Sequence, residues 1–154
     1  MRTHILTLVI FLTAMSCSSE VKKQPFILNP DTGEKMEKEK DKLKYLALGD
    51  SYTIGQSVDI TQRYPVQIAD SLKARGYLVE DPRIIAVTGW TTSDLKAGIA
   101  VANPQGPYDL VSLLIGVNNQ YRGQDINIYR TEFEELLNQS INFAGNDTGR
   151  VIVL

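Results

Sequence analysis

Short apolar runs alternate with segments whose apolar residues recur at helical spacing, from residue 44 to the end of the sequence. The runs show little alternation with polar residues, which is typical of strands buried on both faces of a parallel sheet. Glycine follows two of the amphipathic segments, as expected at the carboxyl ends of helices. The pattern predicts strands at 45–49, 83–87, 109–115 and 150–154, and helices at 63–75, 92–102 and between Asp125 and Gly145.

The order of these elements predicts an α/β fold, a three-layer α/β/α sandwich of the flavodoxin-like type with a parallel sheet. Such domains adopt the strand order 2-1-3-4-5, and the sequence supplies four of these five strands. Residue 154 falls inside the fourth run, which would leave a bare hydrophobic edge of the kind that natural proteins avoid. We therefore expect the domain at 44–154 to be C-terminally truncated. Its ligands should bind beyond the carboxyl ends of the strands.

The N-terminal residues predict export. The run from Ile5 to Met15 is too short to span a bilayer as a helix but suits the apolar core of a secretory signal. Cys17, the only cysteine, follows this run directly, and the arrangement resembles a bacterial lipoprotein signal, in which the cysteine is acylated. The alternative is an ordinary signal peptide that is cut after Ser16. We expect a signal peptide at 1–16, a charged tether at 17–43, and a location in the bacterial cell envelope with a lipid anchor in the membrane at Cys17.

The composition of the chain excludes or disfavours several kinds of site and partner. The chain has 16 Lys and Arg against 18 Asp and Glu, so its net charge of −2 disfavours a nucleic-acid partner. One cysteine excludes a disulfide framework and a cysteine-based zinc site. The single histidine, His4, lies in the predicted signal peptide. We expect neither a metal nor a cofactor.

A polar cluster follows each of the first three predicted strands. The clusters are Gly49-Asp50-Ser51-Tyr52-Thr53, Thr88-Gly89-Trp90-Thr91-Thr92 and Gly116-Val117-Asn118-Asn119-Gln120. In this order, the three clusters resemble the sequence blocks of the SGNH hydrolases, also called the GDSL esterase/lipase family. The resemblance covers residues 44–154 and implies hydrolysis of acyl esters by a serine nucleophile.

The resemblance implies specific roles for these residues. Ser51 would be the nucleophile, and the backbone N–H groups of Ser51 and Gly89 with the side-chain amide of Asn118 would form the oxyanion hole. Such donors stabilise the negative charge that develops on the carbonyl oxygen in the transition state. Asp50 is expected to brace the turn. Asn119 stands where the family commonly has Asp, and we expect it to have a supporting role at the site.

The base that would activate Ser51 is missing from the sequence. In this family it is a histidine three residues after an aspartate, on a late segment, and no Asp-x-x-His occurs here. We expect a truncated product whose coding sequence continues to this motif within about 50 codons. The 154-residue chain should then be inactive or nearly so, with at most the about 10³–10⁴-fold residual catalysis over water that an oxyanion hole supplies. The alternative is a pseudoenzyme that has lost its base.

Three functions therefore stay open. The first is an exported serine esterase or acylhydrolase that acts on small-molecule, glycan or lipid esters. The second is a non-catalytic, ligand-binding surface lipoprotein. The third is a flavodoxin-like cofactor binder in which Ser51, Thr53 and Ser57 cradle a phosphate, although phosphate-binding glycine motifs are absent. For Trp90 and Tyr121 the sequence leaves two positions open, the wall of the pocket and the packed core.

Overall fold

The computed structural model describes residues 42–154. The predicted signal peptide, Cys17 and the tether up to residue 41 lie outside the described residues. Leu43, which the sequence analysis assigns to the tether, forms a parallel bridge with Val79. Its backbone N–H donates to Leu78 O, and its carbonyl accepts from Glu80 N–H. The regular hydrogen bonding of the domain therefore begins at residue 43.

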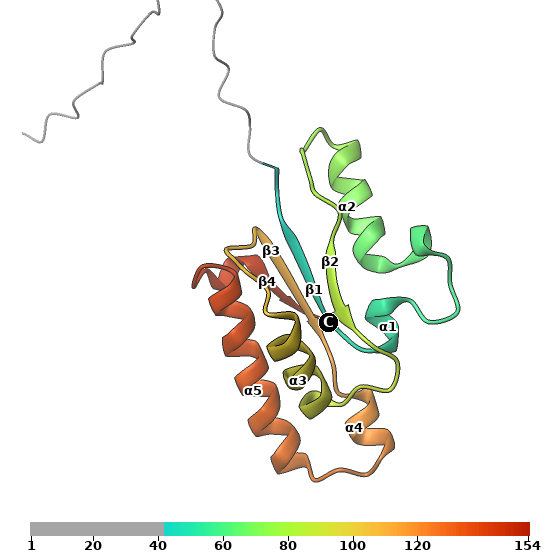
Figure 1. The fold of residues 1–154 in the computed structure, drawn as a ribbon, viewed down its shortest axis with the longest axis vertical. Helices are drawn as coiled ribbons and strands as arrows, with labels where there is room; N and C mark the ends of the chain where they lie inside the picture. The colour runs from blue at the N-terminus through green and yellow to red at the C-terminus, as the bar shows by residue number, and fades with distance from the viewer. Residues whose placement is uncertain (1–41) are drawn as a thin grey trace, which may run out of the picture. The chain divides into compact units, whose positions relative to one another are not determined.

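Four parallel strands form one sheet in the order β2-β1-β3-β4, as Figure 1 shows. The strands are β1 (Tyr45–Gly49), β2 (Arg83–Ala86), β3 (Leu110–Leu114) and β4 (Val151–Val153). They confirm the predicted parallel α/β fold and the predicted order of its first four strands. Among residues 42–154, β2 and β4 are the edge strands. At the β4 edge, Val153 and Leu154 are each about half exposed to solvent.

Long helices connect the strands, and short ones follow two of them. The helices are α1 (Ser51–Ile54), α2 (Tyr64–Ala74), α3 (Thr92–Ala102), α4 (Val117–Tyr121) and α5 (Ile126–Phe143), with 3₁₀ turns η1 (Ile60–Gln62) and η2 (Thr148–Arg150). The three helices with clear apolar periodicity were predicted, and Asp125 caps α5 as expected by accepting from Asn127 N–H. Within residues 42–154, no helix combines the length and the apolar character that crossing a membrane requires.

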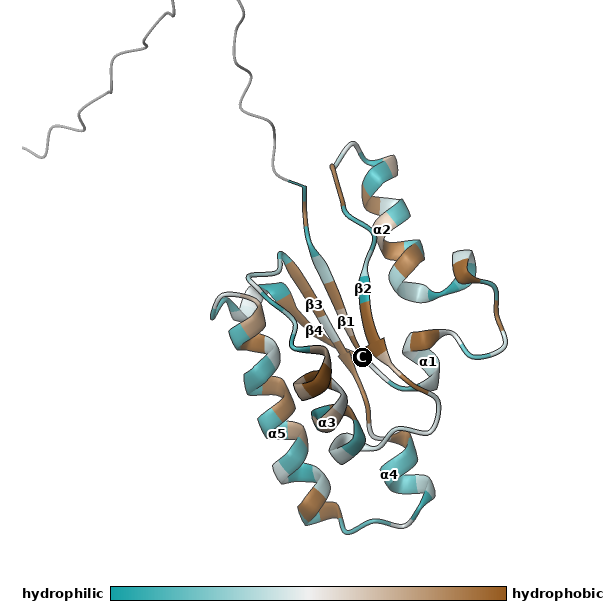
Figure 2. Ribbon diagram, viewed as in Figure 1, coloured by the Kyte–Doolittle hydropathy of each residue, from teal (hydrophilic) through white to brown (hydrophobic). Residues whose placement is uncertain are grey.

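Alternate residues of the strands face two different layers. Leu46 and Leu48 of β1 join Leu95 of α3 and Leu136 of α5 in the main core cluster. On the opposite face, the buried hydroxyls of Tyr45 and Ser112 are 2.8 Å apart, and Tyr64 of α2 lies 3.2 Å from Ser112. Figure 2 shows the strands as mainly hydrophobic, whereas the helices carry polar stretches as well. The carboxyl ends of β1, β2 and β3 meet at one edge, where α1, the loop before α3, and α4 begin.

Candidate active site

The chain turns sharply between β1 and α1. A Cβ on Gly49 would lie 2.0 Å from Thr53 Oγ1 and 2.4 Å from the carbonyl oxygen of Leu114, so only glycine fits this turn. The buried Asp50 caps α1 by accepting a 3.0 Å hydrogen bond from Tyr52 N–H. Ser51, the first residue of α1, is half-buried and lines a cavity of about 510 Å³. The turn thus holds the Ser51 side chain at the carboxyl edge of the sheet.

The loop after β2 brings Gly89 to the same edge. Gly89 has φ +84°, in the left-handed region that favours glycine. Trp90 N–H donates to Val87 O at 3.2 Å, which closes a turn. Helix α3 then begins at a capping box, in which Thr91 and Asp94 each bond the backbone N–H of the other. The capping box fixes the position at which the loop ends.

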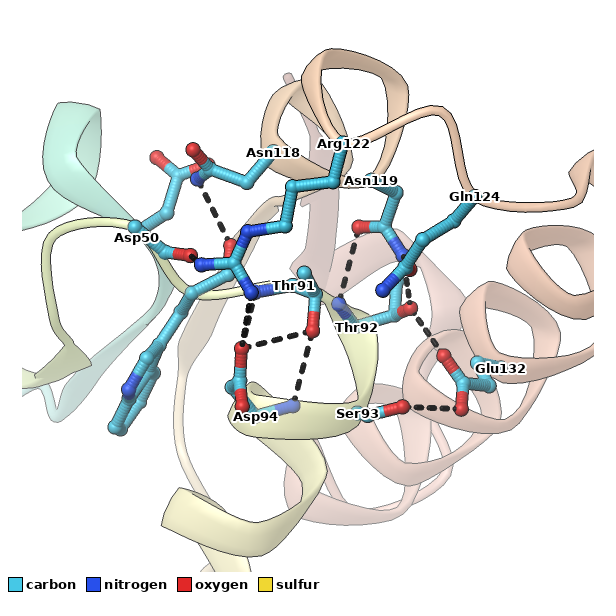
Figure 3. Close-up of polar contacts among 12 residues, drawn as sticks. Asp50, Thr91, Thr92, Ser93, Asp94, Asn118, Asn119, Arg122, Gln124 and Glu132 are labelled. Carbon is cyan, nitrogen blue, oxygen red and sulfur yellow. Dashed lines mark hydrogen bonds and ion pairs between the residues drawn. The ribbon is translucent and has the colours of Figure 1, made fainter.

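Asn118, in the first turn of α4, connects the other two segments. Its amide nitrogen donates to Trp90 O at 2.9 Å and lies 3.4 Å from Asp50 Oδ2 (Figure 3). The neighbours of Asp50 and Trp90 in the chain are Ser51 and Gly89. Three segments that are far apart in the sequence therefore meet around one carboxamide.

Asn119 points into the protein and joins α3 to α4. It is buried, its Oδ1 accepts from Thr92 N–H at 3.1 Å, and its Nδ2 donates to Thr92 Oγ1 at 2.7 Å and to Gln124 Oε1 at 2.8 Å. The Thr92 hydroxyl donates in turn to Glu132 of α5, which also accepts from Ser93 Oγ at 2.5 Å. Figure 3 shows this chain of contacts running from α4 through α3 to α5.

Arg122 approaches the Gly89 loop from the end of α4. Its Nη2 donates to Gly89 O at 2.6 Å, and its Nη1 lies 3.9 Å from Asp94 Oδ2. Asp94 Oδ2 also accepts from Thr91 N–H at 2.9 Å and from Thr91 Oγ1 at 2.8 Å. The carbonyl of Trp90 therefore accepts from Asn118 of α4, and the carbonyl of Gly89 accepts from Arg122, the residue that caps the carboxyl end of this helix.

Three carboxyl groups near these segments have shifted pKa values. Burial raises the pKa of Asp50, although the hydrogen bond from Tyr52 N–H partly opposes this. Hydrogen bonds from Thr91 hold the pKa of Asp94 below its usual value, and the Arg122 charge adds to the effect. Burial acts to raise the pKa of Glu132, but hydrogen bonds from Ser93 and Thr92 outweigh it and the pKa is lowered. Asp94 and Glu132 are thus carboxylates at neutral pH.

The remaining sequence hypotheses have different outcomes. Thr53 is fully buried, so it is not available to a phosphate together with Ser51 and Ser57, and the proposed phosphate cradle does not form. Tyr121 is 90% exposed, outside both the core and the pocket walls described here. Trp90 packs partly against the core cluster and also lines a cavity of about 550 Å³ beside α3. Within residues 42–154, acidic, cysteine and histidine side chains nowhere gather in a group of three that could hold a metal ion.

A comparison with protein families decides the classification. Residues 47–153 match the model of the GDSL-like lipase/acylhydrolase family. The chain belongs to this family. No curated protein matches it.

Solved structures share the fold of this GDSL-like chain. AlinE4, described as an SGNH-hydrolase family esterase, is 24% identical with a TM-score of 0.58, and the match covers 65% of this chain and 53% of AlinE4. TesA is 18% identical with a TM-score of 0.59, over 66% of this chain and 56% of TesA. A putative GDSL-like lipase from Parabacteroides merdae is 18% identical with a TM-score of 0.50, over 73% of this chain and 59% of that protein. The chain thus spans little more than half the length of these structures.

Two residues that hold this edge of the GDSL-like chain together were not predicted from its sequence. Arg122 follows Asn118 by four positions, the spacing that places two side chains on the same face of a helix, and this was the available signal. Glu132 gave no comparable signal, because its contact with Thr92 depends on how α5 packs against α3.

Proposed function

We propose that the protein is a serine ester hydrolase in which the Ser51 hydroxyl attacks the ester carbonyl. The observation that carries the proposal is the position of the Asn118 amide between Trp90 O and Oδ2 of Asp50, the chain neighbour of the half-buried Ser51. Membership of the GDSL-like lipase/acylhydrolase family supports the same reaction class. The cavity of about 510 Å³ that Ser51 lines offers space for part of an ester.

In this proposal, the N–H groups of Ser51 and Gly89 and the Asn118 amide bind the developing oxyanion. One hydrogen of the Asn118 amide is engaged by Trp90 O at 2.9 Å, which orients the carboxamide. The contact of the same nitrogen with Asp50 Oδ2, at 3.4 Å, is longer than an ordinary N–H···O bond, so in this proposal a substrate oxygen takes the place of Asp50 as the second acceptor. One side-chain donor of this kind contributes about 3–4 kcal/mol to transition-state stabilisation.

The reaction also needs a base that takes the Ser51 proton. Residues 42–154 contain no histidine, so in this proposal the base comes from outside these residues. The 154-residue chain by itself is therefore proposed to be inactive or nearly so. The protein to assay is the natural gene product, expressed from its complete coding sequence.

The proposed substrate is a small-molecule, glycan or lipid ester that meets the enzyme outside the cytoplasm. Export and acylation of Cys17 would hold the domain at the membrane of the cell envelope through the charged segment 17–43. Labelling cells with an alkyne fatty acid tests this, because Cys17→Ser should remove both the label and the membrane association. The proposed lipid anchor would be contradicted if the Cys17→Ser variant still carried the label, or if the natural protein were soluble and carried no label.

The decisive experiment compares Ser51→Ala with the natural protein on a short-chain chromogenic ester. We expect the variant to lose at least about 10³-fold in kcat/KM, because removing the nucleophile leaves only the oxyanion hole and substrate binding. Ser71→Ala on α2, an exposed serine outside the segments that form the edge, serves as the control and should keep full activity. Equal rates for Ser51→Ala and the natural protein would exclude Ser51 as the nucleophile. A natural protein that binds esters without hydrolysing them would instead be the non-catalytic surface lipoprotein.

A further inference from the structure

An oxyanion hole that contains Gly89 needs a restraint on that residue. Glycine has more backbone freedom than any other residue, whereas an oxyanion donor must be held in place before the substrate arrives. The loop around Gly89 is open to solvent, since Val87 and Thr88 on its amino side are both exposed. The turn bond from Trp90 N–H to Val87 O fixes the loop internally, and the bond from Asn118 to Trp90 O holds the residue after Gly89, but neither bond is made by Gly89 itself.

Arg122 supplies a restraint on Gly89 itself. Its Nη2 donates to Gly89 O at 2.6 Å, a charge-assisted bond of the short and strong kind. The same nitrogen lies 3.6 Å from the point that a Cβ on Gly89 would occupy, so the guanidinium rests directly against this residue. Asn118 holds the next carbonyl, that of Trp90, at 2.9 Å. Two successive peptide groups of the loop are thus bound to α4.

The guanidinium is itself held in place. Arg122 caps the carboxyl end of α4, where its backbone N–H donates to Asn118 O at 3.0 Å. Its Nη1 faces Asp94 Oδ2 at 3.9 Å, and this carboxylate is fixed by two hydrogen bonds from Thr91. The contacts therefore form a ring from Gly89 through Thr91, Asp94 and Arg122 back to Gly89.

We propose that Arg122 is a positioning residue that sets the spacing between the two oxyanion donors Gly89 N–H and Asn118 Nδ2. The proposal rests on the proposed function of these donors. Asn118 and Arg122 lie one helical turn apart, in α4 and at its carboxyl end. The same short segment therefore provides one donor, the Asn118 amide, and binds Gly89, which provides the other. Arg122 acts by holding the Gly89 carbonyl and not by the long-range field of its charge, because the guanidinium is half-exposed and one of its N–H groups is already bonded to that carbonyl.

The kinetic test compares Arg122→Gln and Arg122→Lys in the natural gene product, on the same chromogenic ester as Ser51→Ala. We expect both variants to lose about 10- to 100-fold in kcat with KM changed less than about threefold, since a displaced donor acts on the transition state and costs less than a deleted one. Lysine keeps the charge but lacks the planar fork that spans Gly89 O and Asp94. Arg130→Gln, at an exposed arginine of α5 with no hydrogen bond or ion pair in the described part of the chain, is the matched control and should keep full activity.

Hydrogen–deuterium exchange of residues 87–91 gives a readout that does not depend on activity. We expect exchange in this loop to be about tenfold faster in Arg122→Gln than in the natural protein and unchanged in Arg130→Gln, with the same urea midpoint of global unfolding in all three. Natural exchange and full kcat in Arg122→Gln would overturn the proposal, as would full activity of Arg122→Lys, which would assign the effect to charge. If Ser51→Ala stays active, the proposed function fails, and faster loop exchange would then mark Arg122 as a structural restraint only.

Discussion

The two walls of the proposed site are built in different ways. The nucleophile wall (residues 49–54) is held by close packing, because a Cβ on Gly49 would collide with Thr53 and with the Leu114 carbonyl. The oxyanion wall (residues 89–94 and 117–122) is held by side-chain hydrogen bonds centred on Thr92 and on Gly89 O. One wall depends on the space between backbones, and the other depends on matched donors and acceptors.

This difference implies two kinds of sensitivity. In the nucleophile wall, added side-chain volume should lower the free energy of unfolding, whereas the loss of a polar atom should change it little. In the oxyanion wall, small changes in volume should change the free energy of unfolding little, whereas the exchange of a hydrogen-bond donor for an acceptor should lower it. Variants that preserve either volume or polarity can separate the two effects.

Gly49→Ala should have the largest effect. The new methyl group would meet the Leu114 carbonyl oxygen at 2.4 Å, and this backbone atom cannot move without disturbing β3. We expect a loss of more than about 3 kcal/mol in the free energy of unfolding, the upper end for overpacked sites. Urea denaturation of the natural gene product measures it.

Two controls belong to this prediction. Gly149→Ala places its methyl group 3.2 Å from the Asp147 carboxylate, which can move, and should cost less than about 1 kcal/mol. Tyr64→Phe removes the long hydroxyl contacts to Thr53 at 3.4 Å and to Ser112 at 3.2 Å, and should also cost less than about 1 kcal/mol. A Tyr64→Phe cost above that of Gly49→Ala would refute the description of this wall as held by packing.

Asn119→Asp should have the second largest effect, although it scarcely changes volume. The amide donates to Thr92 Oγ1 and to Gln124 Oε1, and a carboxylate can do neither. The Thr92 hydroxyl has one hydrogen, which it already gives to Glu132, so two carboxylates would compete for it. We expect the free energy of unfolding to fall by about 2 kcal/mol, as for a buried group that loses its partners.

The double variant Asn119→Asp/Glu132→Gln sharpens this prediction. Glutamine at 132 can donate to Thr92, whose hydroxyl then donates to the new carboxylate at 119. We expect the double variant to be at least about 1 kcal/mol more stable than the sum of the two single costs predicts. Strictly additive costs would show that Thr92 does not couple the two positions.

The smallest effect is expected for Glu132→Gln alone, and it should depend on pH. Hydrogen bonds from Ser93 and Thr92 keep the pKa of Glu132 below its usual value against the effect of burial. The carboxylate therefore adds stability at neutral pH, which the protein loses as the pH falls below about 4 through the lowered pKa. We expect Glu132→Gln to cost about 1 kcal/mol at pH 7 and progressively less as the pH falls through the lowered pKa of Glu132. The same deficit at neutral and at acid pH would rule out this contribution.

The sequence predicted the sheet because apolar runs and helical spacing are local signals. It also placed Ser51, Gly89 and Asn118 at strand ends, which a parallel sheet brings to one edge. Helix α4 was missed because its five residues are too few to show periodicity. The Glu132 contact was missed because it depends on the packing of α5 against α3, which no local pattern records.

The single hydrogen of the Thr92 hydroxyl also restricts the mutational paths open to this protein. A path from this sequence to aspartate at 119 together with glutamine at 132 has two steps, and their order matters. If residue 132 is neutralised first, the intermediate keeps the Asn119 amide and has one carboxylate fewer around Thr92. In the reverse order, two carboxylates compete for one hydroxyl hydrogen in the intermediate, which is the less stable of the two.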